Sequence, residues 1–313
     1  MSTSSFRYLL IIICLAFVSF PLLFINNESK FNGVDALEVT DFAAGNSHSR
    51  SLIFAEMGKV GYNAYVGNAS PETTYATVFR YIFDMPNLER IWVPLHPSFF
   101  YTNDHRKILT LNLIDLLPDH WVAQLMDFEM AYRDALYYWR FGKEWLKSQL
   151  IEDYHTGSEM AENMHVIEGA QHSCETVNPK DIPRLADETV RGNVEESSLQ
   201  NTQGLFFMNA MLSLADRLNV KVIFYVPPYT QSYIDHPSFE VFRTRFNNDL
   251  HDLLSKWKGV YFVDQKDLFS QDQTRFFMDD DHLNCFGARE FSPVIYGNYL
   301  KVAAQEPSSL KAY

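Results

Sequence analysis

The sequence is poor in positive charge, with 26 lysine and arginine residues against 39 aspartate and glutamate residues and a formal net charge of −13. A protein that binds nucleic acid needs a basic face for the phosphates, so this balance argues against a nucleic-acid partner. The sequence also has no internal repeat and no low-complexity tract. Its 313 residues are 47% apolar and 15% aromatic, which is typical of a folded globular protein with one large domain or two small ones.

Cysteine is scarce as well, with Cys14, Cys174 and Cys285 as the three occurrences. There is no C-x-x-C motif and no histidine cluster, so the sequence predicts neither a metal site nor a cofactor. A disulfide bond between Cys174 and Cys285 is possible if that part of the chain is exported. Two lone cysteines do not establish such a bond, and Cys285 could instead fill a small space in the core.

One long apolar run stands at the amino terminus, where residues 8–25 read YLLIIICLAFVSFPLLFI without a charge. Its length is near the lower limit for crossing a bilayer. Arg7 precedes the run, which predicts a cytoplasmic amino terminus and an extracytoplasmic remainder. A cleaved signal peptide is the alternative, but the run is long for one and no A-x-A-like site follows. A lipoprotein signal at Cys14 is disfavoured by the bulky Ile13. We therefore expect residues 1–26 to be an uncleaved single-pass membrane anchor.

Short apolar runs alternate with helical patterns in most of the remaining chain. The expected strands are 36–44, 63–67, 89–95, 220–226 and 259–265. The expected helices are 70–85, 205–219, 239–257 and about 287–303. Such alternation predicts a parallel sheet with crossover helices. We expect residues 34–313 to form a three-layer α/β/α domain around a central five-stranded, mainly parallel sheet.

A stretch from about 105 to 204 interrupts this alternation and predicts a helical insertion without a strand. Its first half is helical and aromatic, and its second half, roughly 152–200, is polar and acidic. An insertion next to a strand end is often a lid or a partner surface, although a pair of surface helices is the alternative. Its aromatic residues could bind sugar or a partner, or they could be core: Tyr137, Tyr138, Trp139 and Phe141.

Ser47 follows the first expected strand directly, within A-A-G-N-S-H-S. In an open parallel sheet, ligands bind beyond the carboxyl ends of the strands. Gly45 would permit a tight turn there, and a helix starting after Ser47 would direct free N–H groups at an oxyanion. The motif alone is weak, because most such serines are helix caps.

The second chemical motif is Asp279-x-x-His282, in a loop ahead of the last expected helix. A serine nucleophile needs a base, and the base needs a carboxylate that fixes its tautomer and stabilises the imidazolium. On one turn, Asp279 can reach the near ring nitrogen of His282 and leave the other free. The alternatives are an acidic surface loop with an incidental histidine, or a metal-binding loop built on three consecutive aspartates. No second cluster of ligands in the sequence supports the metal-binding loop.

Together the two motifs resemble the SGNH (GDSL-like) hydrolase superfamily, over most of residues 37–303 apart from the insertion. GNSHS is similar to the first block of the family and DDDHLN to the last, which implies that Ser47 is the nucleophile, Asp279 the acid and His282 the base. Gly67-Asn68-Ala69-Ser70 is similar to the second block, whose glycine N–H helps to form the oxyanion hole. The resemblance implies that the N–H groups of Ser47 and Gly67 bind the oxyanion and that Asn68 contacts substrate.

The third block departs from the family pattern, which has G-x-N-D after the third strand. Here the strand ends in VPLHPSFF, with His96 and Ser98 near the expected place and Asn103-Asp104 several residues later. We expect Ser98 to substitute as an oxyanion donor and His96 to line the substrate site. The alternative for His96 is packing against Tyr101 or Trp92. Loss of one oxyanion donor can lower the rate about a hundredfold.

The combination of anchor and motifs is most similar to membrane-anchored envelope acyltransferase proteins, such as those of alginate acetylation and teichoic-acid D-alanylation. This resemblance implies an O-acyltransferase or O-acyl esterase acting on a cell-envelope polysaccharide or another envelope acceptor, beside a multipass membrane O-acyltransferase. A non-catalytic scaffold that binds glycan or a membrane partner is the alternative. The missing G-x-N-D favours the scaffold and the intact Ser/Asp/His set opposes it. A lipid or peptide esterase is a third hypothesis.

Overall fold

The computed structural model describes residues 35–65, 69–102, 173–195, 197–269 and 273–305. The expected anchor (1–26), Gly67, Asn68 and the aromatic half of the expected insertion lie outside these residues. None of the helices in the described part has the length and hydropathy needed to cross a membrane.

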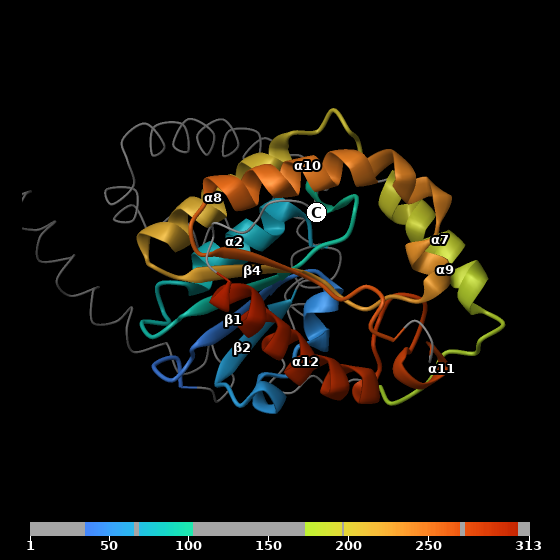
Figure 1. Cartoon of the computed structure of the whole chain (residues 1–313), viewed down its shortest axis with the longest axis horizontal. Helices are drawn as coiled ribbons and strands as arrows, with labels where there is room; N and C mark the ends of the chain where they lie inside the picture. Colours follow the sequence, from blue (N-terminus) through green and yellow to red (C-terminus); the bar gives the residue numbers. More distant parts are fainter. Residues whose placement is uncertain (1–34, 66–68, 103–172, 196, 270–272, 306–313) are drawn as a thin grey trace, which may run out of the picture.

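A five-stranded parallel sheet forms the centre of the fold, in the order β2-β1-β3-β4-β5 (Figure 1). The strands are β1 (Asp41–Gly45), β2 (Gly61–Tyr65), β3 (Arg90–Pro94), β4 (Lys221–Val226) and β5 (Val260–Asp264). All five lie within or beside the expected runs, which confirms the predicted parallel α/β sheet. The first run was expected to begin at residue 36, but Leu37 is 61% exposed in a turn and the strand begins at Asp41.

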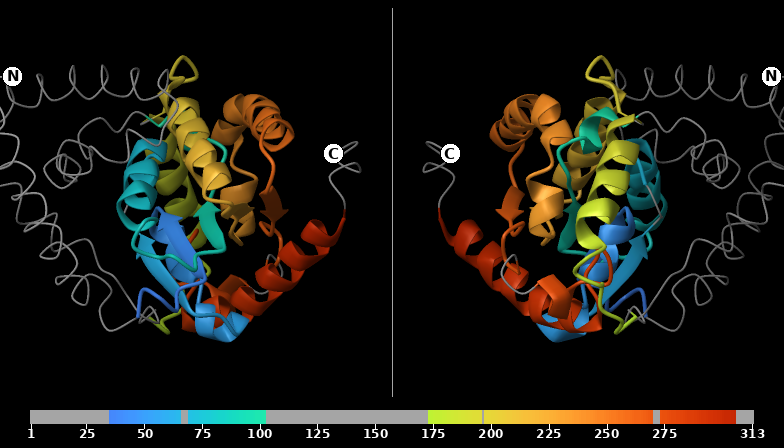
Figure 2. Two further views of the ribbon diagram at one scale, coloured as in Figure 1. Left: turned by 90° about the vertical axis from the view of Figure 1, so that its left-hand side faces the viewer. Right: turned by 90° about the vertical axis from the view of Figure 1, so that its right-hand side faces the viewer.

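The sheet is covered on both faces, which explains why its strands have apolar residues at successive positions, as in residues 91–93 of β3 and 222–226 of β4. In β4, Val222 and Phe224 belong to the core beneath the helices of one face, whereas Ile223 and Tyr225 belong to the core of the other. The first face is covered by α2 (Pro71–Tyr81), α8 (Gln203–Arg217) and α10 (Glu240–Lys256). The second is covered by α12 (Cys285–Ala304), as Figures 1 and 2 show.

Two of the helices in the described residues, α2 and α12, start at side-chain caps. Ser70 accepts the N–H of Thr73 at the start of α2, and Asn284 accepts the N–H groups of Phe286 and Gly287 at the start of α12. The last helix was expected from about 287, but this cap places its first turn at Cys285. Short turns complete the fold: η2 (Ser47–Ser51), η3 (Phe54–Met57), η4 (Phe99–Tyr101), α9 (Gln231–Ile234), η6 (Pro237–Phe239) and α11 (Gln273–Phe276).

Part of the expected insertion is an ordinary layer of the fold. Residues 182–195 form α7 (Ile182–Glu195), within the half that was expected to be a polar, acidic stretch. Ala186 and Val190 of this helix pack with Tyr229 and Tyr233, beside α9. Residues 203 and 204 already belong to α8. The expected boundary at 204 is therefore too late, because α8 begins the next crossover to the sheet.

A buried ion pair joins the amino-terminal ends of β1 and β3. Asp41, fully buried, accepts hydrogen bonds from Arg90 Nε at 2.6 Å and Nη2 at 2.8 Å, and from Trp92 Nε1 at 2.9 Å. This bidentate geometry compensates for the removal of both charges from water.

A disulfide bond links Cys174 to Cys285, the first residue of α12, across 111 residues of chain. The N–H of Cys285 donates to the carbonyl of Ser173 at 3.1 Å, and that of Val177 donates to the carbonyl of Phe277 at 3.0 Å. The possible pairing of these cysteines is therefore present, and Cys285 is more than a filler of the core. The bond ties the segment before α7 to the loop that contains Asp279 and His282.

Candidate active site

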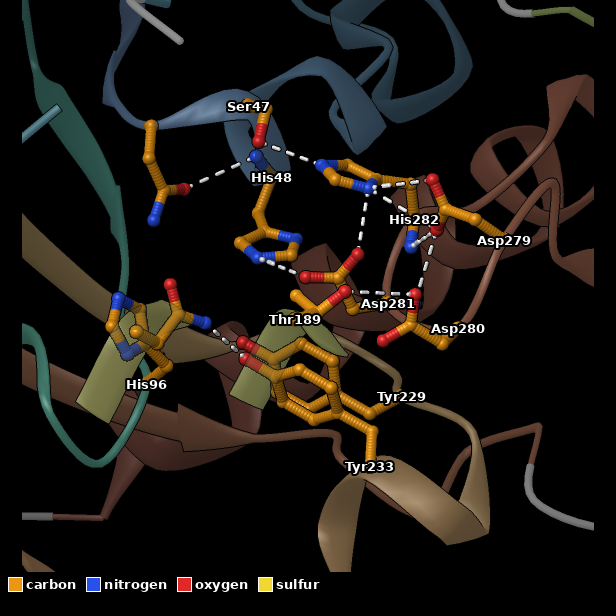
Figure 3. Close-up of polar contacts among 12 residues, drawn as sticks. Ser47, His48, His96, Thr189, Tyr229, Tyr233, Asp279, Asp280, Asp281 and His282 are labelled. Carbon is orange, nitrogen blue, oxygen red and sulfur yellow. Dashed lines mark hydrogen bonds and ion pairs between the residues drawn. The ribbon is translucent and has the colours of Figure 1, made fainter. Parts of the chain in front are cut away.

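Ser47, His282 and Asp279 meet beyond the carboxyl end of β1 (Figure 3). Ser47 Oγ lies 2.6 Å from His282 Nε2, although the two residues are 235 positions apart in the sequence. The other ring nitrogen, Nδ1, lies 3.0 Å from Asp279 Oδ2 and 3.2 Å from Oδ1. The structure thus brings together all three residues that the sequence predicts as a triad, in the order of contacts that a serine nucleophile requires.

The turn after β1 is shaped by Gly45 and Asn46. Gly45 has a φ of 141°, and the side chain of Asn46 caps η2 by accepting the N–H of His48 at 3.1 Å. The carbonyl of Asn46 accepts the N–H of Ser49 at 3.0 Å. Because those two N–H groups are engaged, they are not available to an oxyanion. The sequence predicted that the helix after Ser47 would direct free N–H groups at an oxyanion. In the structure this role is left to the N–H of Ser47 itself.

The turn that carries the base is closed by Asp279. Its Oδ1 accepts the N–H of Asp281 at 3.0 Å and that of His282 at 2.6 Å, which is the local geometry of an Asp-x-x-His turn. Asn284 then caps α12 and donates through Nδ2 to the carbonyl of Arg275 at 2.8 Å. The base is consequently held by a rigid turn at the start of a long helix.

Two further side chains, not predicted from the sequence, contact the base. Asp281 Oδ1 lies 2.7 Å from His282 Nδ1, and Asp281 Oδ2 lies 3.4 Å from His48 Nε2. The imidazole of His48 stacks on that of His282, with 4.7 Å between ring centroids and 18° between planes. Asp281 and His48 are 5% and 6% exposed, whereas the side chain of Asp279 is 31% exposed. Two features of the sequence could have indicated these contacts: a histidine directly after Ser47 and a third carboxylate directly before His282.

The electrostatics of the two histidines differ. Burial lowers the pKa of His48 to about 4, in spite of the charge of Asp281, so His48 is neutral at pH 7. For His282 burial acts in the same direction, but the charge of Asp281 and the contacts with Asp279 and Asp281 outweigh it and raise its pKa well above the usual 6.5. Burial would raise the pKa of Asp281, but the charges of His282 and His48 lower it. Any proton shared by these groups at neutral pH therefore resides on His282.

Asp280 faces away from the base. Burial, together with the charges of Asp281 and Asp279, raises the pKa of Asp280 to about 7. Its Oδ1 accepts the hydroxyl of Thr189 on α7 at 3.2 Å, and its carbonyl accepts the hydroxyl of Thr230 at 2.7 Å. This residue anchors the loop to its surroundings.

His96 and Ser98 form a separate buried pair. Ser98 Oγ lies 3.0 Å from His96 Nδ1, and the His96 ring meets the edge of Phe99 at 5.8 Å. The ring contact described for His96 is thus with Phe99, whereas the expected alternative was packing against Tyr101 or Trp92. Within the described residues no hydrogen bond joins His96 or Ser98 to the triad, and Figure 3 shows His96 without a contact to it. Their expected roles in oxyanion and substrate binding stay predictions, as do those of Gly67 and Asn68.

An open depression of about 270 Å³ lies over Ser47 and His282. Its lining is mixed polar and apolar: Ser47, His48, Arg50, Ser51, Pro227, Met278, Asp281, His282 and Leu283. The guanidinium of Arg50 lies 5.4 Å from the ring centroid of Tyr65.

Potential metal ligands also come together here. The ligand atoms of His48, Asp281 and His282 lie within 4.8 Å of one another, as do those of Asp279, Asp280 and Asp281. Asp281 belongs to both groups and is already paired with the two histidines, and His282 Nε2 faces Ser47. The donor atoms thus engage each other, and the absence of a metal requirement stays a prediction.

The described residues define an α/β protein with a five-stranded parallel sheet and a Ser–His–Asp constellation beyond its carboxyl edge. No protein-family model matches the chain, and no curated protein matches it either. The likeness to the SGNH superfamily therefore depends on the motifs themselves.

Proposed function

We propose that the chain is a serine-dependent O-acyltransferase or O-acyl esterase of the SGNH type, acting on a cell-envelope polysaccharide through an acyl-Ser47 intermediate. The observation that carries this proposal is the continuous set of contacts from Ser47 Oγ through His282 to Asp279 at the carboxyl edge of a parallel sheet. Nucleophile, base and orienting carboxylate are all within direct reach of one another.

The chemistry follows from these contacts. Ser47 Oγ attacks the acyl carbonyl while His282 Nε2 takes the hydroxyl proton, and Asp279 at Nδ1 stabilises the imidazolium that forms. The N–H of Ser47, with that expected from Gly67, binds the oxyanion. The leaving group departs with the proton from His282. A sugar hydroxyl or water then attacks the acyl-serine, gives its proton to His282 and regenerates Ser47 as the leaving alcohol.

The depression over Ser47 is open to solvent, so a polymeric acceptor would approach the acyl-serine from outside the protein. Transfer and hydrolysis share the acyl-serine, so the acceptor that reaches the intermediate decides between them. The expected anchor would hold this site at the extracytoplasmic membrane surface, where a multipass O-acyltransferase could supply the acyl group.

The non-catalytic scaffold is the second candidate, and one observation favours it. The raised pKa of His282 leaves its imidazole charged at neutral pH, and a charged imidazole cannot take the proton of Ser47. An enzyme with this site should therefore be more active at alkaline pH, whereas a scaffold would be inactive throughout.

The deciding experiment uses the full chain, purified in detergent, with p-nitrophenyl acetate from pH 6 to pH 10. We expect a burst of p-nitrophenol and an acetyl adduct on Ser47 by peptide mass spectrometry. Both should be lost in Ser47→Ala and His282→Ala. The matched controls are Ser255→Ala and His251→Ala, two exposed positions on α10, which should react as the intact chain does. Folded protein without adduct or burst across the whole pH range would favour the scaffold.

A further inference from the structure

The turn that carries Ser47 contacts one ring nitrogen of the base directly and reaches the other through a carboxylate. Ser47 itself meets His282 Nε2, and the next residue, His48, meets the carboxylate of Asp281 that faces His282 Nδ1. We propose that Asp281, held in place by His48, is a second orienting carboxylate of the base and a positioning residue for acyl transfer. This inference rests on the proposed function.

The two carboxylates at Nδ1 are held differently. Asp279 is partly exposed, and its Oδ1 also accepts two N–H groups of its own turn. Asp281 is almost fully buried, and its Oδ1 lies closer to Nδ1, at 2.7 Å against 3.0 Å for the nearer oxygen of Asp279. A buried charge is screened less by solvent and salt than an exposed one. Asp281 should therefore affect the charge of His282 at least as strongly as Asp279 does.

His48 is fixed on every side. Its N–H donates to Asn46 Oδ1 at 3.1 Å, and its carbonyl accepts the hydroxyls of Ser51 at 2.5 Å and Tyr225 at 3.4 Å. Its ring stacks on His282 and meets the ring of Tyr229 at 5.4 Å in an edge contact. His48 Nε2 lies 3.4 Å from Asp281 Oδ2, while Oδ1 of the same carboxylate faces the base.

This arrangement links the position of the nucleophile to that of the base. Ser47 and His48 both belong to η2, so a shift of η2 would move Ser47 Oγ and the imidazole that contacts Asp281 together. The contacts at the two ring nitrogens of His282 would then change together. Because His48 is neutral, Asp281 has one cationic partner, the imidazolium of His282. Among the described residues, the ionisable groups that face the site include Asp279 and Asp281 from the base loop, His48 and Arg50 from η2, and Tyr229 after β4. His96, after β3, interacts electrostatically with His48 and Asp281.

The test follows the protonation of His282 in the full chain, by histidine-selective NMR titration and by the pH dependence of acetylation. In the intact chain we expect His282 to titrate well above His48. Asp281→Asn should lower the midpoint of His282 by about one pH unit or more, since an opposite charge at this distance shifts a pKa by roughly 1–3 units. His48→Phe should shift it in the same direction, and His48→Gln, which keeps a donor, should restore much of it.

Asp280→Asn is the matched control, because it removes the neighbouring carboxylate, which faces Thr189 and not the base. It should move the midpoint of His282 by much less than Asp281→Asn does. An unchanged midpoint in Asp281→Asn, or a His48 that titrates above His282 in the intact chain, would overturn the inference. The NMR titration needs no turnover, so a shifted midpoint without acetylation would support the role of Asp281 while the proposed function fails. Should Asp281→Asn not fold, the intact titration and the His48 variants still decide.

Discussion

Gly45, the last residue of β1, lies so close to Pro94 of β3 that a Cβ atom on Gly45 would be 2.7 Å from Pro94 Cδ and 3.2 Å from Ser49 Oγ. With a φ of 141°, its backbone also disfavours any other residue. Gly45→Ala should therefore move the turn of Ser47 away from the base. We expect a loss of stability of about 2 kcal/mol or more and a roughly hundredfold slower acetylation.

The control for that change is Gly58→Ala, at a φ of 65° with no atom within 4 Å of the added Cβ. Gly58→Ala has a backbone penalty of about 1 kcal/mol but no steric clash of the kind expected at Gly45. Its acetylation rate should be unaffected. Chemical unfolding and the acetylation rate measure both effects. Equal behaviour of the two variants would show that Pro94 does not constrain the turn.

The buried pair of Asp41 and Arg90 should be costly to break. Arg90→Met leaves the Asp41 carboxylate without a cation in a fully buried position, for an expected loss of roughly 3–5 kcal/mol in urea unfolding. Arg184→Ala removes an arginine from an exposed pair with Glu188 on α7 and should change stability little. A small effect of Arg90→Met would mean that water reaches Asp41.

The disulfide bond between Cys174 and Cys285 should stabilise the chain by restricting its unfolded state. The double change Cys174→Ser and Cys285→Ser removes a cross-link between positions 111 residues apart. We expect the free energy of unfolding, measured by chemical unfolding, to fall by about 2–5 kcal/mol. Reductant should have the same effect on the intact chain and none on the double variant. Cys14→Ser is the control, since that residue is not in the bond. Unfolding curves that superimpose would show that the bond is absent in solution.

Stability should fall in mild acid because of His96. Burial, with the charge of His48 added, lowers its pKa to about 3 from 6.5. Between these values the folded protein binds fewer protons than the unfolded chain. The contribution is therefore complete above pH 6.5 and is lost as the pH falls, by roughly 3 kcal/mol at pH 4. His48 acts in the same direction.

The measurement compares unfolding free energies at pH 7 and pH 4 for the intact chain and for His96→Gln. The variant should lose less stability between the two pH values, because one buried group no longer has to be protonated. His251→Gln, on the exposed face of α10, should follow the intact chain. If His96→Gln loses as much stability between pH 7 and pH 4 as the intact chain does, the effect belongs to His48 or to the carboxylates.

The sheet could be predicted from sequence because its inner strands are buried on both faces and contain runs of successive apolar residues. β4 is the clearest example, with five of its six residues buried. The ends of the strands were harder to predict, since Leu37 is as apolar as the strand that follows but lies in an exposed turn. Helix α7 was missed because its exposed side is charged, with arginine and acidic residues in pairs. Its buried residues Ile182, Ala186 and Val190 recur every four positions, which is a helical pattern.

The triad residues could be located because each lies in a short motif whose geometry is local. The role of Asp281 could not, because three consecutive aspartates give no sign of which ones face the ring. That choice is made by the turn through Asp279 Oδ1 and by His48, which lies more than two hundred residues earlier in the chain. Contacts of this kind depend on the packed fold and are not visible in either motif alone.

The separation of 235 positions between Ser47 and His282 also orders events in time. Ser47 is made early in synthesis, and its base follows near the end of the chain, just ahead of α12, whose packing on η3 and β5 holds the base loop in place. If the proposed function holds, a growing chain would carry an inert serine. Acyl transfer would then begin with the docking of the last helix, so that reactivity itself would report a finished molecule.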